Sequence, residues 1–90
     1  MNKATIFTRS EDLQIEELQG EGLILNQQTL ETHHLNQHSF LVLNLFNGER
    51  ALNDVIELLT EAYPGEDSIE ADVLETTQKL LDSGIIKLVS

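Results

Sequence analysis

Three histidines near the middle of the chain are the residues whose types and spacing most invite chemistry. His33 and His34 are adjacent, and His38 follows shortly after them. Imidazole is a common metal ligand, so the cluster is a candidate metal site. However, residues 31–35 resemble a strand, on which adjacent side chains point to opposite faces, so at most one of the pair can join His38. The pattern favours a strand pair and a residue in a first helical turn, and it predicts no metal site.

Acidic side chains at helical spacing are the second candidate. Asp54, Glu57 and Glu61 recur along one predicted helix. A catalytic acid needs an apolar pocket that raises its pKa, and nothing near these positions suggests one. The chain also lacks a nucleophile elbow, an ordered catalytic triad and a glycine-rich phosphate loop. We therefore predict that the protein is not an enzyme and uses no cofactor.

The charge balance excludes two classes of partner. Sixteen Asp and Glu residues against five Lys and Arg residues give a net charge of −11. Binding to nucleic acids or anionic membranes needs a cationic surface, so neither is expected. No Lys or Arg occurs between Arg50 and Lys79, and the many acidic residues of this stretch are interpreted as solvated helix faces.

Length and cysteine content bound the fold and its compartment. The chain has 90 residues, enough for one domain with a modest core, and 40% of them are hydrophobic, as in soluble globular domains. The absence of cysteine excludes disulfides and thiolate metal sites, and it favours the cytoplasm. The first residues lack the apolar stretch of a signal peptide.

Short strands are predicted before residue 36. Leu13 and Ile15 alternate with polar neighbours, and a glycine-rich turn then leads into a second strand over residues 23–26. Residues 31–35 are interpreted as a third strand after a short connection. Three short strands joined by short turns predict an antiparallel meander.

The period then changes to that of helices. Asn36 suits an N-cap and precedes residues 37–46, which are apolar almost all round and should form the central buried helix. A second helix is predicted over residues 52–62. A third is expected to be capped by Ser68 and to end at Gly84.

The third helix carries more apolar surface than one contact needs. It has two neighbouring stripes, one of Ile69, Val73, Thr76 and Leu80 and the other of Leu74, Thr77 and Leu81. We expect one stripe to pack on the core and the other to face a groove. The pattern does not say which stripe does which.

The predicted fold class is α+β, with a three-stranded antiparallel sheet followed by three helices. Residues 1–10 show no clear period and are expected to form a flexible arm before a domain of residues 11–90. Residues 85–89 should form a terminal strand or an apolar tail on the core. The free edge of such a sheet can accept another strand, either from a peptide or from a second copy of the chain. This leaves two function classes open, a peptide-binding module and a homodimerising adaptor.

A third class, DNA binding, can be judged from the charge of the third helix. A recognition helix should present Arg and Lys to phosphates. The predicted third helix instead has one basic residue, Lys79, against acidic residues at Glu70, Asp72, Glu75 and Asp82. The charge of this helix argues against DNA.

Specific residues of the chain resemble the PqqD family. The resemblance begins with Gly22-Leu23-Ile24-Leu25-Asn26 and Leu35-Asn36, and continues with an apolar helix that closes on Phe46-Asn47-Gly48-Glu49-Arg50. It extends through Val55-Ile56, Tyr63 and Asp72-Val73 to Leu80-Leu81-Asp82-Ser83-Gly84-Ile85-Ile86. Two departures are the lack of a tryptophan near Leu43, where family members often have one, and Ala51 in place of the usual Thr or Ser before the second helix.

The resemblance implies a winged helix-turn-helix-like domain that binds the leader of a ribosomally made precursor peptide. The leader is added as a strand along the third strand, beside the third helix. The domain then acts as a peptide chaperone that presents the precursor to a modifying enzyme, often a radical SAM enzyme. The resemblance leaves open whether the pathway is pyrroloquinoline quinone (PQQ) synthesis. The implied peptide-binding residues are Glu31, Thr32, His33, His34, Leu35, Asp72, Thr76, Lys79 and Leu80.

Overall fold

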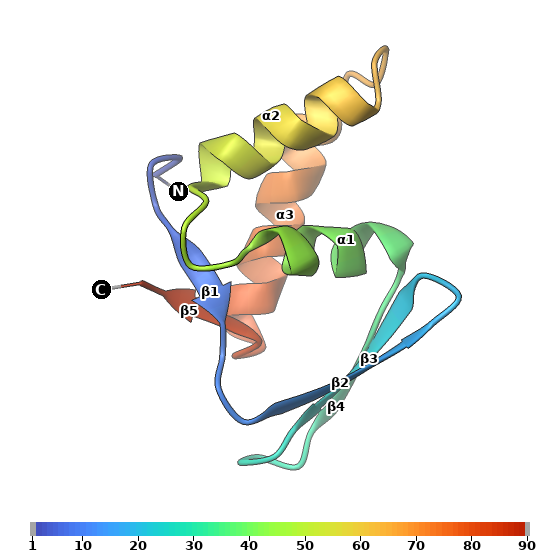
Figure 1. The fold of residues 1–90 in the computed structure, drawn as a ribbon, viewed down its shortest axis with the longest axis vertical. Coiled ribbons are helices and arrows are strands. Elements are labelled where there is room, and N and C mark those ends of the chain that lie inside the picture. The colour runs from blue at the N-terminus through green and yellow to red at the C-terminus, as the bar shows by residue number, and fades with distance from the viewer. Residues whose placement is uncertain (1, 90) are drawn as a thin grey trace.

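The computed structural model describes residues 2–89. Its elements follow the order β1 (Phe7–Arg9), β2 (Leu13–Leu18), β3 (Glu21–Asn26), β4 (Thr32–Leu35), α1 (Gln37–Leu45), α2 (Leu52–Ala62), α3 (Ile69–Asp82) and β5 (Ile86–Leu88). The α+β class, the three-stranded sheet and the three helices confirm the sequence prediction. Figure 1 shows the β2–β3–β4 sheet beside α1, while β1 and β5 lie together elsewhere on the molecule.

The meander of β2, β3 and β4 is antiparallel, in that order. The turn between β2 and β3 consists of Gln19 and Gly20, both with positive φ, at 55° and 83°. This is the two-residue hairpin turn that matches the twist of the strands. Because the turn is this short, β3 begins at Glu21, two residues before the predicted start. At the other end of the sheet, β4 begins at Thr32 rather than at the predicted Glu31.

One face of this sheet packs on α1. Ile24 and Gly22 of β3 are buried on this face, and Leu35 of β4 is paired with Gly22. A Cβ atom at Gly22 would lie only 2.3 Å from Cδ1 of Phe40. The strand therefore needs glycine here because the Phe40 ring occupies the space of a side chain.

Asn36 is the N-cap of α1, as the sequence predicts. Its Oδ1 accepts a hydrogen bond from the Ser39 N–H at 2.8 Å. The helix ends at Leu45, so Phe46 follows it as the C-cap instead of closing it. Gly48 has a φ of +84° and lies two residues beyond this C-cap.

Replacing Asn36 by alanine should lower the free energy of unfolding by about 1 kcal/mol, because an initial N–H of α1 loses its acceptor. Urea unfolding followed by circular dichroism measures the change. Ser39→Ala keeps the N–H that Asn36 caps and serves as the control. An unchanged midpoint in Asn36→Ala would contradict the capping role.

The start of α2 is capped by the N-terminal segment. Ala51 has no side-chain acceptor, but the N–H groups of Leu52 and Asn53 donate to the carbonyls of Thr5 and Lys3, each at 2.8 Å. The Asp54 carboxylate accepts the N–H of Ala51 at 2.9 Å. The initial N–H groups of the helix are thus satisfied by other groups.

The two ends of α3 differ from each other in how they are capped. Ser68 does not cap the helix with its side chain, contrary to the prediction, and its hydroxyl instead donates to Asp72 at 3.0 Å. At the other end Gly84 has a φ of +74°, and the N–H of Ile85 donates to the Leu80 carbonyl at 2.9 Å. This is the Schellman arrangement expected of a glycine after a helix.

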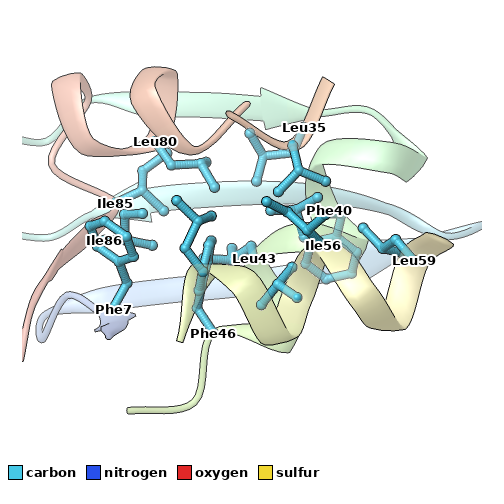
Figure 2. Close-up of a cluster of buried hydrophobic side chains, with 14 of the residues drawn as sticks. Phe7, Leu35, Phe40, Leu43, Phe46, Ile56, Leu59, Leu80, Ile85 and Ile86 are labelled. Carbon is cyan, nitrogen blue, oxygen red and sulfur yellow. The ribbon is translucent and has the colours of Figure 1, made fainter. Parts of the chain in front are cut away.

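The expected loose arm of residues 1–10 is wrong for the part that forms β1. Phe7–Arg9 pairs antiparallel with β5, and Phe7 is 1% exposed. The ring of Phe7 meets Phe46 edge to face, with centroids 5.3 Å apart. Figure 2 shows Phe7 with Ile85 and Ile86 in the core, beside Phe46. The N-terminal segment is held in place because the Phe7 side chain fills the core and the carbonyls of Lys3 and Thr5 cap α2.

Candidate functional site

The open edge of β4 is the first component of the site. The Glu31 carbonyl accepts the N–H of Asn26 at 2.9 Å, so the backbone of Glu31 turns toward β3. Residues of an antiparallel strand alternate in this direction. The main-chain N–H and C=O groups of His33 therefore point toward β3. Those of Thr32 and His34 point toward the open edge. Two residues of β4 thus offer N–H and C=O groups to an added strand.

A groove lies between this edge and α3. Its volume is about 480 Å³. It is lined from the β4 side by Thr32, His33, His34, Leu35, Asn36 and Ser39, and from the other side by Thr76, Lys79, Leu80, Ser83 and Ile85. The spacing of Thr76, Lys79 and Leu80 places all three on one face of α3. The groove therefore runs beside the strand whose edge is open.

The floor of the groove is apolar and its rim is polar. Leu35, Leu80 and Ile85 are buried side chains of the core (Figure 2). Thr76 is 8% exposed, and Lys79 at the rim forms an ion pair with Glu75 at 3.1 Å. Such a floor would hold an aliphatic side chain, and the rim would remain in contact with water.

His33 and His34 lie on opposite faces of the sheet, as predicted from the strand period. Nε2 of His34 lies 2.7 Å from Oε1 of Glu21 on the outer face. His33 is half-buried, and its Nε2 has no hydrogen-bond partner among residues 2–89. The two side chains therefore have different surroundings, although both residues line the groove.

Seven of the nine residues predicted to bind a peptide line this groove. They are Thr32, His33, His34, Leu35, Thr76, Lys79 and Leu80. Glu31 directly precedes β4, and Asp72 lies in the first turn of α3, where it lines two neighbouring hollows. The structure therefore brings together the two segments that the sequence proposed, but not all of their residues.

Within residues 2–89, no group of three or more His, Cys, Asp and Glu side chains could hold a metal ion. Asp54, Glu57 and Glu61 are exposed along α2, outside the groove. Over the same described residues, no helix combines the length and apolar content needed to cross a bilayer.

A family model described as coenzyme PQQ synthesis protein D (PqqD) matches residues 15–86. The chain belongs to the PqqD family. The match covers β3, β4, all three helices and most of β2, and therefore the groove of this family member. It begins after β1, so the capping of α2 by the N-terminal segment lies outside it.

Three solved structures have the same fold. TbiB1 in complex with the TbiA(β) leader peptide has a TM-score of 0.78 and 13% identity, and the match covers 92% of this chain and 98% of that one. Lasso peptide synthetase B1 complexed with the leader peptide has a TM-score of 0.75 and 20% identity, with 90% and 96% covered. The heterocyclase TruD has a TM-score of 0.70 and 21% identity, with 94% of this chain matched to 12% of that one. Comparison with curated proteins gives no match.

Four groove residues of this family member were missed by the sequence reasoning. Asn36 and Ser39 lie at the start of α1, and Ser83 and Ile85 follow α3. The sequence identified Asn36 as a cap and placed Ile85 in the terminal segment. Their second role depends on how α1 and α3 cross, which local patterns do not report.

Proposed function

We propose that this protein is a non-catalytic recognition domain that binds the leader of a ribosomally made precursor peptide and presents the peptide to a separate modifying enzyme. The observation that carries the proposal is the open β4 edge beside an apolar-floored groove along α3. The complexes of TbiB1 and lasso peptide synthetase B1, which share the fold, contain leader peptides and support it.

The two parts of the site would contribute differently to binding. Main-chain groups of Thr32 and His34 would pair with any extended peptide, so they supply affinity without reading its sequence. The groove beside them would select side chains through Leu80, Thr76 and Lys79. A leader with an aliphatic residue aimed into this groove would be preferred.

The proposed role ends at recognition. The family description names PQQ synthesis, and one structural neighbour is a heterocyclase in which the fold occupies 12% of the chain. The modification that follows would be set by the partner enzyme, a radical SAM enzyme if the pathway is that of PQQ. The domain itself would supply the bound leader.

An amide NMR titration with the leader of a precursor encoded beside this protein tests the proposal. Shifts should concentrate at residues 31–35 and along residues 72–80. Absence of shifts at saturating peptide, both with and without the partner enzyme, would reject leader recognition. Sedimentation of the protein alone separates the alternative, because a tight dimer that ignores peptide would indicate an adaptor that pairs through the same edge.

His34→Pro should weaken leader binding at least tenfold, because proline removes the outward N–H of β4. His34→Ala is the matched control, since it removes the imidazole and its contact with Glu21 but keeps the N–H. Fluorescence anisotropy of a labelled leader measures both affinities. Equal losses in the two variants would show that the side chain matters rather than the strand edge.

A further inference from the structure

The groove continues beyond the end of β4 along α3. A second hollow of about 200 Å³ shares Asn36, Ser39, Thr76 and Lys79 with it. A third hollow of about 380 Å³ shares His38 and Asp72 with the second. The three hollows therefore lie one after another along α3, from its last turn to its first, and we call this row of hollows the channel. We call the third hollow the end hollow.

Two histidines in this channel have unsatisfied polar atoms. Within residues 2–89, the only buried side-chain N or O atoms without a hydrogen-bond partner are Nε2 of His33 and Nε2 of His38. His33 lines the groove, and His38 lines both of the other hollows. A buried unpaired polar atom costs free energy and needs an explanation. Both nitrogens are closed off from the surface in the free protein, so a ligand in the channel could pair with them only after the imidazole ring turns.

The end hollow has an apolar wall and an acidic rim. Leu41 and Ile69 belong to the wall, and Tyr63 is 49% exposed beside them. The rim has two carboxylates, those of Glu66 and Asp72, and no Lys or Arg of the described chain lines the hollow. The groove near β4, in contrast, has no carboxylate among its lining residues, and its Lys79 is paired with Glu75. The carboxylates of the channel therefore lie in its middle and in the end hollow.

We propose that the leader runs past the edge of β4 and places an apolar side chain with a neighbouring Lys or Arg in the end hollow, where the His38 ring turns to hydrogen-bond to it. This inference rests on the proposed leader binding and names the class of leader. The 14 residues of α3 span about 21 Å, which about six extended residues would cover. β4 itself has four residues, so the channel adds contacts that strand pairing alone does not provide.

His38→Leu tests the polar contact. An apolar side chain removes the unpaired nitrogen, so the free protein should keep or raise its urea midpoint. Leader affinity should nevertheless fall about three- to tenfold, the loss of one hydrogen bond. Unchanged affinity would overturn the role of His38. Opposite signs for stability and binding would distinguish a ligand contact from a structural one.

Glu66→Gln tests the charge of the end hollow. Asp72 also lies in the first turn of α3, where a carboxylate stabilises the helix dipole, so Glu66 is the cleaner site. Its replacement should lower leader affinity about two- to fivefold in 20 mM salt and have little effect in 500 mM salt. Glu57→Gln, exposed on α2 away from the channel, is the control and should leave affinity unchanged. Equal effects in the two variants would contradict the proposal.

The NMR titration separates the two levels of inference. Shifts along β4 and at Leu41 and Ile69 support both. Shifts along β4 that stop before these two residues reject the end hollow and leave the proposed function standing. Absence of shifts in both regions rejects both.

Discussion

Phe7→Ala is expected to lower the free energy of unfolding by about 3–5 kcal/mol. The ring is 1% exposed and lies edge to face with Phe46, which is fully buried. Its removal leaves a cavity between β1, β5 and the C-terminal end of α1, and also weakens the segment that caps α2. Small domains have only about 5–15 kcal/mol of stability, so much of it would be lost.

Urea unfolding of Phe7→Ala measures the effect, and Phe7→Leu should recover more than half of it. Thr8→Ala, at the neighbouring half-buried position, is the control and should change the stability by less than about 1 kcal/mol. If Phe7→Ala were as stable as the unmodified protein, the first residues would be the loose arm that the sequence suggested.

Gly22→Ala is the second substitution with a large expected effect. The added methyl group would lie 2.3 Å from Cδ1 of Phe40 and within 3 Å of two further ring carbons, so the sheet and α1 must separate or the ring must turn. We expect a loss of about 1–3 kcal/mol, the usual cost of overpacking a core. Because Gly22 pairs with Leu35 of β4, the open edge should also shift and leader binding should weaken.

Phe40→Leu provides the second arm of a double-mutant cycle. Each single variant should be destabilised, and the pair should be more stable than the sum of the two losses predicts, because the smaller side chain leaves room for the methyl group. Additive losses would show that the methyl group and the ring do not compete for the same space. Glu21→Ala, next to Gly22 in β3, should be nearly neutral.

Local patterns were sufficient for the elements with a clear period. The alternation in β2, the Asn36 cap, the stripe of α2 and the glycine after α3 all appear in the structure. They were sufficient because each depends on residues within one or two turns of one another. Of the two stripes of α3, the one with Val73, Thr76 and Leu80 is buried, and Thr77 of the other is fully buried with it.

Long-range pairing explains what the sequence could not predict. β1 has three residues, and its partner is at the other end of the chain, so no local period marks it. Ala51 looked like a lost cap because its replacements, the carbonyls of Lys3 and Thr5, lie far away in sequence. Ser68 looked like a cap, but its hydroxyl binds Asp72.

The candidate site also has one part that the sequence indicates and one part that it does not. The strand 31–35 and the face of α3 with Thr76 and Leu80 were found from the sequence, by resemblance and spacing. The end hollow was not, because it forms only where the connection after α2 brings Tyr63 and Glu66 against the start of α1. His38 was interpreted as an ordinary residue of a first helical turn, and only its surroundings show that its Nε2 lacks a partner.

The antiparallel pairing of β1 with β5 also determines how the domain responds to mechanical force. Phe7 is opposite Leu88 and Arg9 is opposite Ile86, so the segment before β1 and the segment after β5 lie at the same end of the ladder. A pull on the two ends of the chain would load the hydrogen bonds one after another, as in a zipper, rather than all together in shear. The carbonyls of residues 3 and 5, which lie nearer the pulled end, would leave α2 first. The terminal ladder should then yield at low force, and its opening would release Phe7 from the core.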